Sequence, residues 1–84
     1  MGLNMKIIKF YSPSCGPCKV LDTNLKNANI EYESVNVHAD ENAELVDKYS
    51  IRNIPTLIKE LDGVESKRFT GIMSVEQLKE WCNE

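Results

Sequence analysis

The feature that most constrains the fold is an apolar strand that leads, across a short turn, into a helix opened by two cysteines. The run from Lys6 to Tyr11 is apolar and aromatic and ends at Ser12-Pro13, which predicts a buried strand. A helix with one apolar face is expected next, because residues recur at helical spacing at Cys18, Leu21, Leu25 and Ala28. Pro17 suits the first turn of that helix, where backbone N–H groups lack intrahelical partners.

Two further elements are expected in the middle of the chain. Residues Ile30 to Val37 have a strand-like pattern, in which Val35 and Val37 alternate with a polar residue. Asp40 is expected to cap a second helix, because acidic residues follow it and stabilise a helix N-terminus. The apolar positions of that helix are Leu45, Val46 and Tyr49.

The last part of the chain predicts a hairpin and a final helix. Thr56 to Leu61 and Val64 to Thr70 flank Asp62-Gly63, a dipeptide that strongly favours a tight hairpin turn. Ser74 is expected to cap the last helix, with Gln77 at the reciprocal position of a capping box. The inward-facing positions of this helix are Val75, Leu78 and Trp81 or Cys82.

The order of elements is therefore strand, helix, strand, helix, strand, strand, helix. A strand-helix-strand start requires a parallel pair with a right-handed crossover, and the hairpin adds antiparallel strands. These elements predict a mixed four-stranded sheet inside a three-layer α/β/α sandwich. We expect one domain over residues 1–84, with residues 1–4 a disordered extension and Met5 the natural start.

Composition excludes several classes of protein. The chain has 84 residues and a formal net charge of -3, whereas sequence-independent nucleic-acid binding needs clustered Lys and Arg. No apolar run approaches the roughly 20 residues that a membrane span requires. Three cysteines are too few, and odd in number, for a secreted disulfide framework. These observations favour a cytoplasmic protein in which a close cysteine pair performs redox chemistry or binds metal.

The segment Cys15-Gly16-Pro17-Cys18 carries the chemistry. A helix N-terminus bears partial positive charge and unpaired N–H groups, so it favours the thiolate of Cys15 and lowers its pKa. The spacing allows the sulfur of Cys18 to reach that of Cys15 within one helical turn. Cys15 at the exposed end is predicted to attack a disulfide, and Cys18 on the inward face is predicted to resolve the mixed disulfide.

The same residues resemble the thioredoxin family. The segment from Tyr11 to Lys19 is similar to the active-site segment of that family, and Tyr49 to Leu57 resembles the segment with its cis-proline. Asp40 to Asn42 resembles the start of the second helix of that fold, and Gly71 to Glu80 resembles the start of its last helix. The matches occur in the right order over most of the chain from Lys6 onward.

The resemblance implies a thioredoxin fold and a protein disulfide reductase. Pro55 is expected to be cis beside the Cys15–Cys18 pair, the backbone of Ile54 to pair with an extended substrate, and Gly71 to allow close approach of a partner. Substrates would be protein disulfides, and the electron donor a flavoprotein disulfide reductase. We expect a monomer with no cofactor other than the redox-active disulfide, and no nucleic-acid or membrane partner.

The chain also departs from the family pattern. It begins directly at the central strand, as in the smaller, glutaredoxin-sized members, and so lacks the extra N-terminal strand and helix. Ser14 replaces a tryptophan that often precedes the first cysteine. Lys9 stands where thioredoxins place a buried carboxylate. Its ammonium would either stabilise thiolate and raise the reduction potential, or extend to solvent and do neither.

Two alternative functions remain open at the level of sequence. A glutathione-dependent, glutaredoxin-like enzyme is favoured by the length, by Tyr11 and by the absence of the tryptophan. The Gly-Pro dipeptide and the lack of a second glycine and an acidic residue after Gly71 disfavour it. The other alternative is a non-enzymatic thiol or zinc module that docks a partner through the groove beside Pro55. In its zinc version, His38 and Cys82 would complete a Cys₃His site with the cysteine pair. The simpler role for Cys82 is that of a small buried hydrophobic residue.

Overall fold

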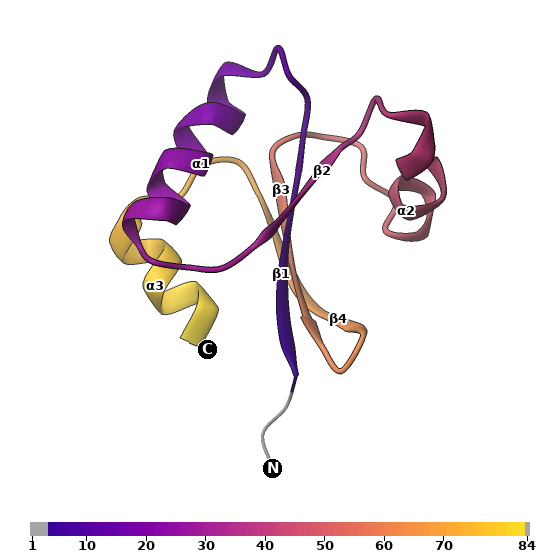
Figure 1. Ribbon diagram of the computed structural model, residues 1–84. Coiled ribbons are helices and arrows are strands. Elements are labelled where there is room, and N and C mark those ends of the chain that lie inside the picture. Colours follow the sequence, from indigo (N-terminus) through magenta and orange to yellow (C-terminus); the bar gives the residue numbers. More distant parts are fainter. Residues whose placement is uncertain (1–3, 84) are drawn as a thin grey trace.

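The computed structural model describes residues 4–83 and has the predicted order of elements. Figure 1 shows their arrangement around the sheet. The strands are β1 (Met5–Tyr11), β2 (Glu33–Asn36), β3 (Thr56–Leu61) and β4 (Val64–Thr70). The helices are α1 (Gly16–Asn27), the 3₁₀ turn η1 (Asp40–Asn42), α2 (Ala43–Lys48) and α3 (Val75–Asn83). No helix in this part of the chain is long and apolar enough to span a membrane.

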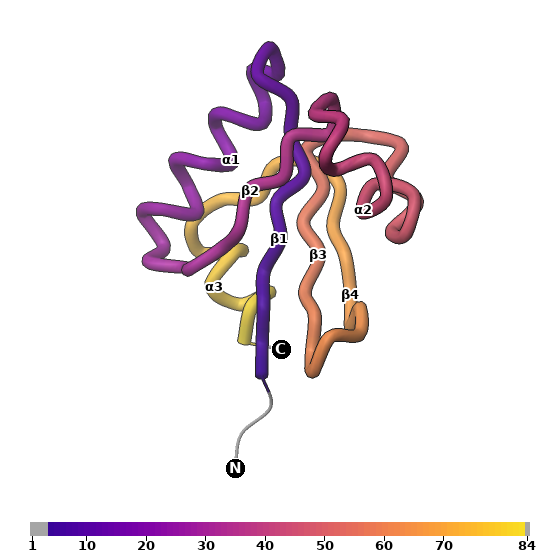
Figure 2. Tube along the Cα trace, turned by 45° about the vertical axis from the view of Figure 1, so that its right-hand side comes forward, coloured from indigo at the N-terminus to yellow at the C-terminus, as the bar shows by residue number. Residues whose placement is uncertain are grey.

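The four strands form one mixed sheet in the order β2-β1-β3-β4. β1 pairs in parallel with β2, placing Phe10 opposite Val35, and antiparallel with β3, placing Lys9 opposite Leu57. β3 and β4 form the antiparallel hairpin. Helices α1 and α3 cover one face of the sheet and α2 covers the other (Figures 1 and 2). The predicted three-layer sandwich is therefore confirmed.

The core is divided in two by the sheet, because successive side chains of a strand point to opposite faces. Ile7 of β1 belongs to the cluster under α1 and α3, and the adjacent Ile8 belongs to the cluster under α2. The first cluster also contains Leu21, Leu25, Ala28, Leu57, Met73, Leu78 and Cys82. The second also contains Phe10, Val35, Tyr49 and Ile58. Both helical layers are thus attached to the sheet by apolar packing.

Strand β2 is shorter than predicted. The sequence pattern extends from Ile30 to Val37, but ladder pairing covers only Glu33–Asn36. The N–H of Ile30 donates to the carbonyl of Leu25 at 3.2 Å, so the chain is still leaving α1 at that point. Tyr32 turns its hydroxyl toward Asp22 of α1. The connection from α1 to β2 therefore occupies the residues that were expected to begin the strand.

The prediction that Asp40 caps the second helix is wrong. Asp40 is the first residue of the 3₁₀ turn η1, and neither this turn nor α2 has a side-chain cap hydrogen bond. Asn42 occupies the N-cap position of α2, but its amide donates to the carbonyl of Asn36 at 3.0 Å. This side chain ties the turn to the end of β2.

The β3–β4 hairpin has the predicted bounds and contains an irregularity that the sequence did not indicate. Lys59 pairs with Lys67 and Glu60 with Glu65, so Ser66 is an extra residue on β4. An extra residue reverses the alternation of side chains along a strand, which brings residues three apart onto one side. Glu65 and Arg68 lie on one side of β4 for this reason, and they form an ion pair.

Arg68 links the edge of the sheet to helix α2. Its guanidinium donates to both carboxylate oxygens of Glu65, at 2.6 and 2.8 Å, and to the carbonyl of Tyr49 at 2.7 Å. Tyr49 is the C-cap residue of α2, where carbonyl groups lack intrahelical partners. The nearby guanidinium lowers the pKa of Glu65 from its ordinary value, so the pair is charged at neutral pH.

Helix α3 has satisfied groups at both ends. The predicted capping box is confirmed: the N–H of Gln77 donates to the hydroxyl of Ser74 at 3.2 Å, and the N–H of Ser74 donates to the amide oxygen of Gln77 at 2.9 Å. At the other end, the buried Lys59 donates to the carbonyl of Cys82 at 2.8 Å. A cation at a helix C-terminus also interacts favourably with the helix dipole.

The start of the described chain is attached to the hairpin turn. The N–H of Asn4 donates to the carboxylate of Asp62 at 3.0 Å, and the N–H of Asp62 donates to the carbonyl of Asn4 at 2.9 Å. The expected disordered extension therefore does not include Asn4. Residues 1–3 of that extension lie outside the described residues.

Replacing Arg68 tests how α2 is held. We expect Arg68→Gln to lower the free energy of unfolding by about 1 kcal/mol, because a solvent-screened ion pair with Glu65 is lost and a helix-end carbonyl loses its partner. Urea denaturation monitored by circular dichroism measures the change. Arg52→Gln, at an exposed position, is the matched control and should have a much smaller effect. Equal effects of the two substitutions would contradict this account.

Candidate active site

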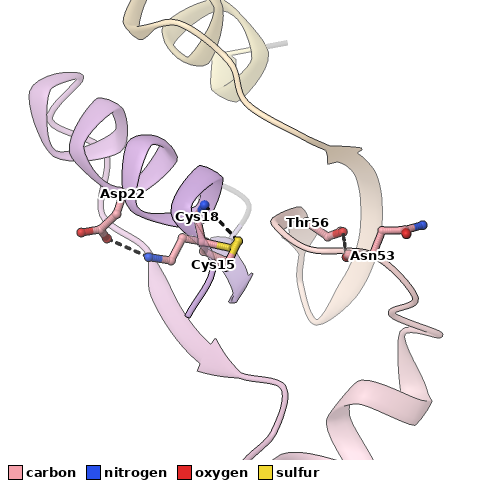
Figure 3. Close-up of a disulfide and its surroundings, with 6 residues drawn as sticks. Cys15, Cys18, Asp22, Asn53 and Thr56 are labelled. Atoms are coloured by element: carbon pink, nitrogen blue, oxygen red, sulfur yellow. Dashed lines mark hydrogen bonds and ion pairs between the residues drawn. A yellow bond between two sulfur atoms is a disulfide. The ribbon is translucent and has the colours of Figure 1, made fainter. Parts of the chain in front are cut away.

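The two cysteines of the Cys-Gly-Pro-Cys segment lie at the N-terminus of α1. Cys15 is the N-cap residue, and its sulfur accepts a hydrogen bond from the N–H of Cys18 at 3.1 Å. The two sulfurs form a disulfide, with the Cα atoms 5.3 Å apart (Figure 3). Cys18 is buried, with 2% of its surface exposed, whereas Cys15 is only partly buried. Gly16 and Pro17 between them are exposed.

The Ile54–Pro55 peptide bond is cis, the isomer that the resemblance implies. Phe10 at the end of β1 pairs with Thr56 at the start of β3, so Pro55 lies at the same end of the sheet as the disulfide. The hydroxyl of Thr56 donates to the carbonyl of Asn53 at 2.7 Å, and Figure 3 shows these two residues across from the cysteines. The loop is thus fixed by its own hydrogen bonds.

Gly71 lies beside the same loop. Its N–H donates to the carbonyl of Pro55 at 2.9 Å, which joins the end of β4 to the start of β3. Its φ angle is +116°, a conformation that residues with a side chain rarely adopt. An added Cβ would meet Phe69 at 3.8 Å, an ordinary contact. Within this chain, the backbone conformation and not a lack of space calls for glycine.

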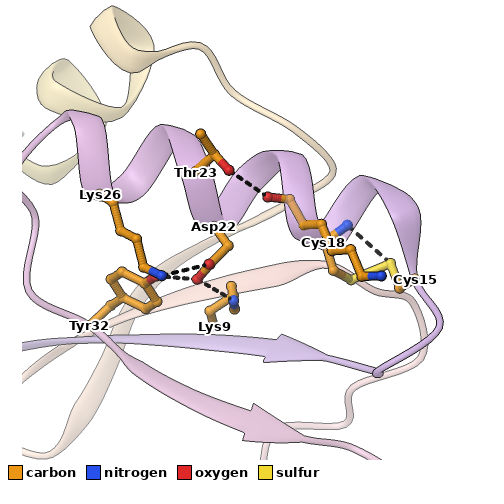
Figure 4. A network of polar contacts seen from close by, with 8 residues as sticks. Lys9, Cys15, Cys18, Asp22, Thr23, Lys26 and Tyr32 are labelled. Atoms are coloured by element: carbon orange, nitrogen blue, oxygen red, sulfur yellow. Dashed lines mark hydrogen bonds and ion pairs between the residues drawn. A yellow bond between two sulfur atoms is a disulfide. The ribbon is translucent and has the colours of Figure 1, made fainter.

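Lys9 is buried beneath α1 and paired with a carboxylate (Figure 4). Its Nζ lies 2.8 Å from Asp22 Oδ1, and 6% of its side chain is exposed. The hydroxyl of Tyr32 donates to the same carboxylate oxygen, and Lys26 lies 3.2 Å from the other one. The Lys9 ammonium also faces the rings of Tyr11 and Tyr32, at 4.9 and 5.3 Å from their centroids. The alternative in which Lys9 extends to solvent is therefore wrong.

The electrostatics of this network follow from its hydrogen bonds. Lys9 and Tyr32 donate to Asp22 and hold the pKa of that carboxyl well below its usual range. Burial and the adjacent carboxylate raise the pKa of Tyr32 above its ordinary value. Asp22 therefore remains a carboxylate, and Tyr32 a neutral hydroxyl, throughout the neutral pH range.

A pocket of about 260 Å³ connects the ion pair with the disulfide. Its lining includes Lys9, Asp22 and Cys18, and the other lining residues are Tyr11, Ser12, Pro13 and Lys19. Asp22 follows Cys18 by one helical turn on α1, so both project from the same side of the helix. The inward cysteine thus shares one hollow with a buried cation and its anion.

The residues of the predicted zinc alternative are not gathered at this site. His38 is exposed on the turn after β2, where its N–H donates to the side chain of Asn36. Cys82 is buried near the end of α3, and burial raises the pKa of its thiol. Within residues 4–83 no three His, Cys, Asp or Glu side chains are placed to share a metal ion.

Sequence reasoning missed Asp22 and Tyr32. Asp22 could have been found, because residues four apart on a helix share a face and Cys18 lies four residues earlier. Tyr32 carried no such signal. It reaches Asp22 because the chain returns from α1 to β2 at that point.

Comparisons with known proteins agree with this arrangement. The family model for thioredoxin matches residues 3–84. The chain is 34% identical over 80 residues to a thioredoxin of Chlamydia pneumoniae, covering 92% of this chain and 78% of that protein. It is 35% identical over 78 residues to a thioredoxin of Bacillus subtilis strain 168, covering 88% and 75%. The solved thioredoxin of Fasciola hepatica has a TM-score of 0.75 at 29% identity, covering 95% and 79%. A thioredoxin mutant from Halobacterium salinarum NRC-1 has a TM-score of 0.81 at 26% identity, covering 94% and 72%.

Fold and cysteine pair together define a thiol-disulfide oxidoreductase, a protein that exchanges a dithiol for a disulfide. The chain belongs to the thioredoxin family. Its substrates are accordingly protein disulfides.

Asp22→Asn tests the ion pair through pH. A carboxyl with a lowered folded-state pKa contributes stability above its ordinary pKa of 3.8 and loses it as pH falls from there toward the folded value. We expect the variant to be about 2 kcal/mol less stable than the wild type at neutral pH, because Lys9 loses a charged partner. The difference should narrow as pH falls below 3.8, because the unfolded wild type then takes up a proton that the folded protein does not yet bind.

Urea titrations of both proteins across this pH range provide the measurement. Asp47→Asn, at an exposed position of α2, is the matched control and should show a much smaller difference at neutral pH. If the difference in the free energy of unfolding between wild type and Asp22→Asn stayed constant down to low pH, the carboxylate charge would not be what stabilises the fold.

Proposed function

We propose that the protein acts as a reductase of protein disulfides, with Cys15 as nucleophile and Cys18 as resolving residue. The observation that carries this proposal is the unequal exposure of two cysteines at one helix N-terminus: Cys15 is accessible and Cys18 is buried behind it. The partial positive charge of the helix end favours a thiolate at Cys15 once the disulfide is reduced. The hydrogen bond from the N–H of Cys18 to the Cys15 sulfur supports the same charge.

The cycle uses two successive exchanges. The Cys15 thiolate attacks one sulfur of the substrate disulfide, which forms a mixed disulfide and releases the other substrate sulfur as a thiolate that takes up a proton. Cys18, after losing its proton, attacks the Cys15 sulfur, forms the Cys15–Cys18 disulfide and releases the second substrate thiolate, which is also protonated. Two electrons pass from the cysteine pair to the substrate, and two substrate thiols result.

The substrate segment is proposed to lie along the cis-proline loop. The backbone of Ile54 would pair with an extended substrate segment, next to Pro55, as a short strand addition. The fixed loop and the hydrogen bond from Gly71 to Pro55 support this role, because a preformed edge reduces the conformational cost of binding. Gly71, without a side chain, would allow a partner to approach the loop.

The wider cycle requires a two-electron donor that returns the disulfide to the dithiol. We propose a flavoprotein disulfide reductase as this donor, and action as a monomer in the cytoplasm. No bound cofactor is needed, because the Cys15–Cys18 pair itself carries the electrons. The acidic net charge of -3 fits a protein that does not bind nucleic acid or a membrane surface.

Cysteine replacements test the assigned roles. We expect Cys15→Ser to lower the rate of insulin disulfide reduction to the rate that dithiothreitol gives alone, because the variant has no Cys15 thiolate to attack the substrate. Reduced Cys18→Ser, freed of dithiothreitol before the substrate is added, should accumulate a mixed disulfide with the substrate that is visible by mass spectrometry, because no resolving thiol is present. Cys82→Ala is the matched control and should retain activity, since Cys82 is a core residue of α3 that does not line the pocket beside the disulfide. Substantial turnover by the Cys15 variant would rule out the proposed mechanism.

A further inference from the structure

A lysine buried in the core is costly unless its charge is compensated, because the ammonium loses its hydration. Lys9 lies on the face of β1 that carries Ile7 and is paired with Leu57 of β3, and both of these residues belong to the apolar cluster under α1 and α3. Asp22 supplies the compensating charge from α1. Replacing a buried ion pair by apolar residues is often neutral or stabilising, so the presence of this pair is not explained by stability alone.

The pair lies beside the sulfur whose charge changes during the cycle. Cys18 shares its pocket with the paired charges of Lys9 and Asp22, and Lys19 adds a second cation to the lining. A nearby cation favours a thiolate and a nearby anion disfavours it. The two partners therefore act on the Cys18 sulfur in opposite directions.

Other groups near Lys9 and Asp22 change the net charge that this pair presents to Cys18. Tyr32 donates to Asp22 from the segment before β2, and Lys26 contacts the outer carboxylate oxygen from α1. Both reduce the negative charge that Asp22 presents to its surroundings. Lys19 also lines the pocket from α1, and Tyr11 lines it from β1 with its ring facing the Lys9 ammonium.

We propose that Lys9 and Asp22 are positioning residues for the resolving step, an opposed charge pair that sets how readily Cys18 forms the thiolate that attacks the mixed disulfide. Lys9 promotes the thiolate, and Asp22 both anchors Lys9 and limits its effect. Tyr32 weakens the opposing charge of Asp22 by donating a hydrogen bond to it. This inference rests on the proposed role of Cys18 as the resolving residue.

The test measures the ionisation of Cys18 directly. In a Cys15→Ser, Cys82→Ala background Cys18 is the remaining thiol, and its ionisation is followed by thiolate ultraviolet absorbance as a function of pH. Lys9→Met should decrease the ratio of thiolate to thiol at a fixed pH by about tenfold, and Asp22→Asn should increase it by a similar factor. In the double variant, the ratio of thiolate to thiol at Cys18 should lie close to that of the background protein.

Lys6→Met is the matched control. Lys6 is also a lysine of β1 in an ion pair, 3.3 Å from Glu33, but both side chains are largely exposed and neither lines the pocket. The control should leave the ionisation of Cys18 unchanged. Circular dichroism of each variant establishes that it is folded, and a merely structural role of the pair would not shift the ionisation in opposite directions.

The outcomes separate this inference from the proposed function. Shifts in the same direction for Lys9→Met and Asp22→Asn, or no shift in either, would overturn the inference while the wild type still reduced insulin. Failure of the wild type to reduce insulin would instead overturn the proposed function. As a second readout, Lys9→Met with both active-site cysteines intact should resolve its mixed disulfide more slowly than the wild type, and equal rates would count against the role of Lys9.

Discussion

The structure depends on the alternation of side chains along β1, an inner strand that is hydrogen-bonded on both sides. Ile8 and Phe10 anchor the layer that contains α2, whereas Ile7 and Lys9 face the layer that contains α1. The same strand leads into the turn that presents Cys15. The distance between the buried ammonium and the cysteine pair is therefore set by a rigid sheet and a helix packed on it, which hold side chains more precisely than loops do.

The elements that the sequence predicted correctly are those governed by near neighbours. The hairpin around Asp62-Gly63 and the capping box of Ser74 and Gln77 depend on residues only a few positions apart. The residues next to the Cys-Gly-Pro-Cys segment likewise predicted a strand before it and a helix after it. Local conformational preference and hydrophobic period are sufficient for such features.

The features that the sequence did not predict depend on contacts between distant segments. The first part of the expected strand from Ile30 is taken up by the return from α1, and Asn42 uses its side chain on β2 instead of capping α2. The partner of Lys9 became evident only with α1 packed on the sheet, because thirteen positions separate Lys9 from Asp22. Resemblance identified Lys9 as unusual, but tertiary packing determined what it contacts.

The irregular pairing at Ser66 has a consequence for the outer edge of the sheet. β4 is an edge strand, and the unpaired backbone groups of a regular edge can act as a template for strands of other molecules. An extra residue twists such an edge out of register, and the charged side chains of Glu65, Lys67 and Arg68 follow closely on either side of it. The extra residue on β4, which places Arg68 beside Glu65 and α2, thus also makes this edge of the sheet a poor template for aggregation.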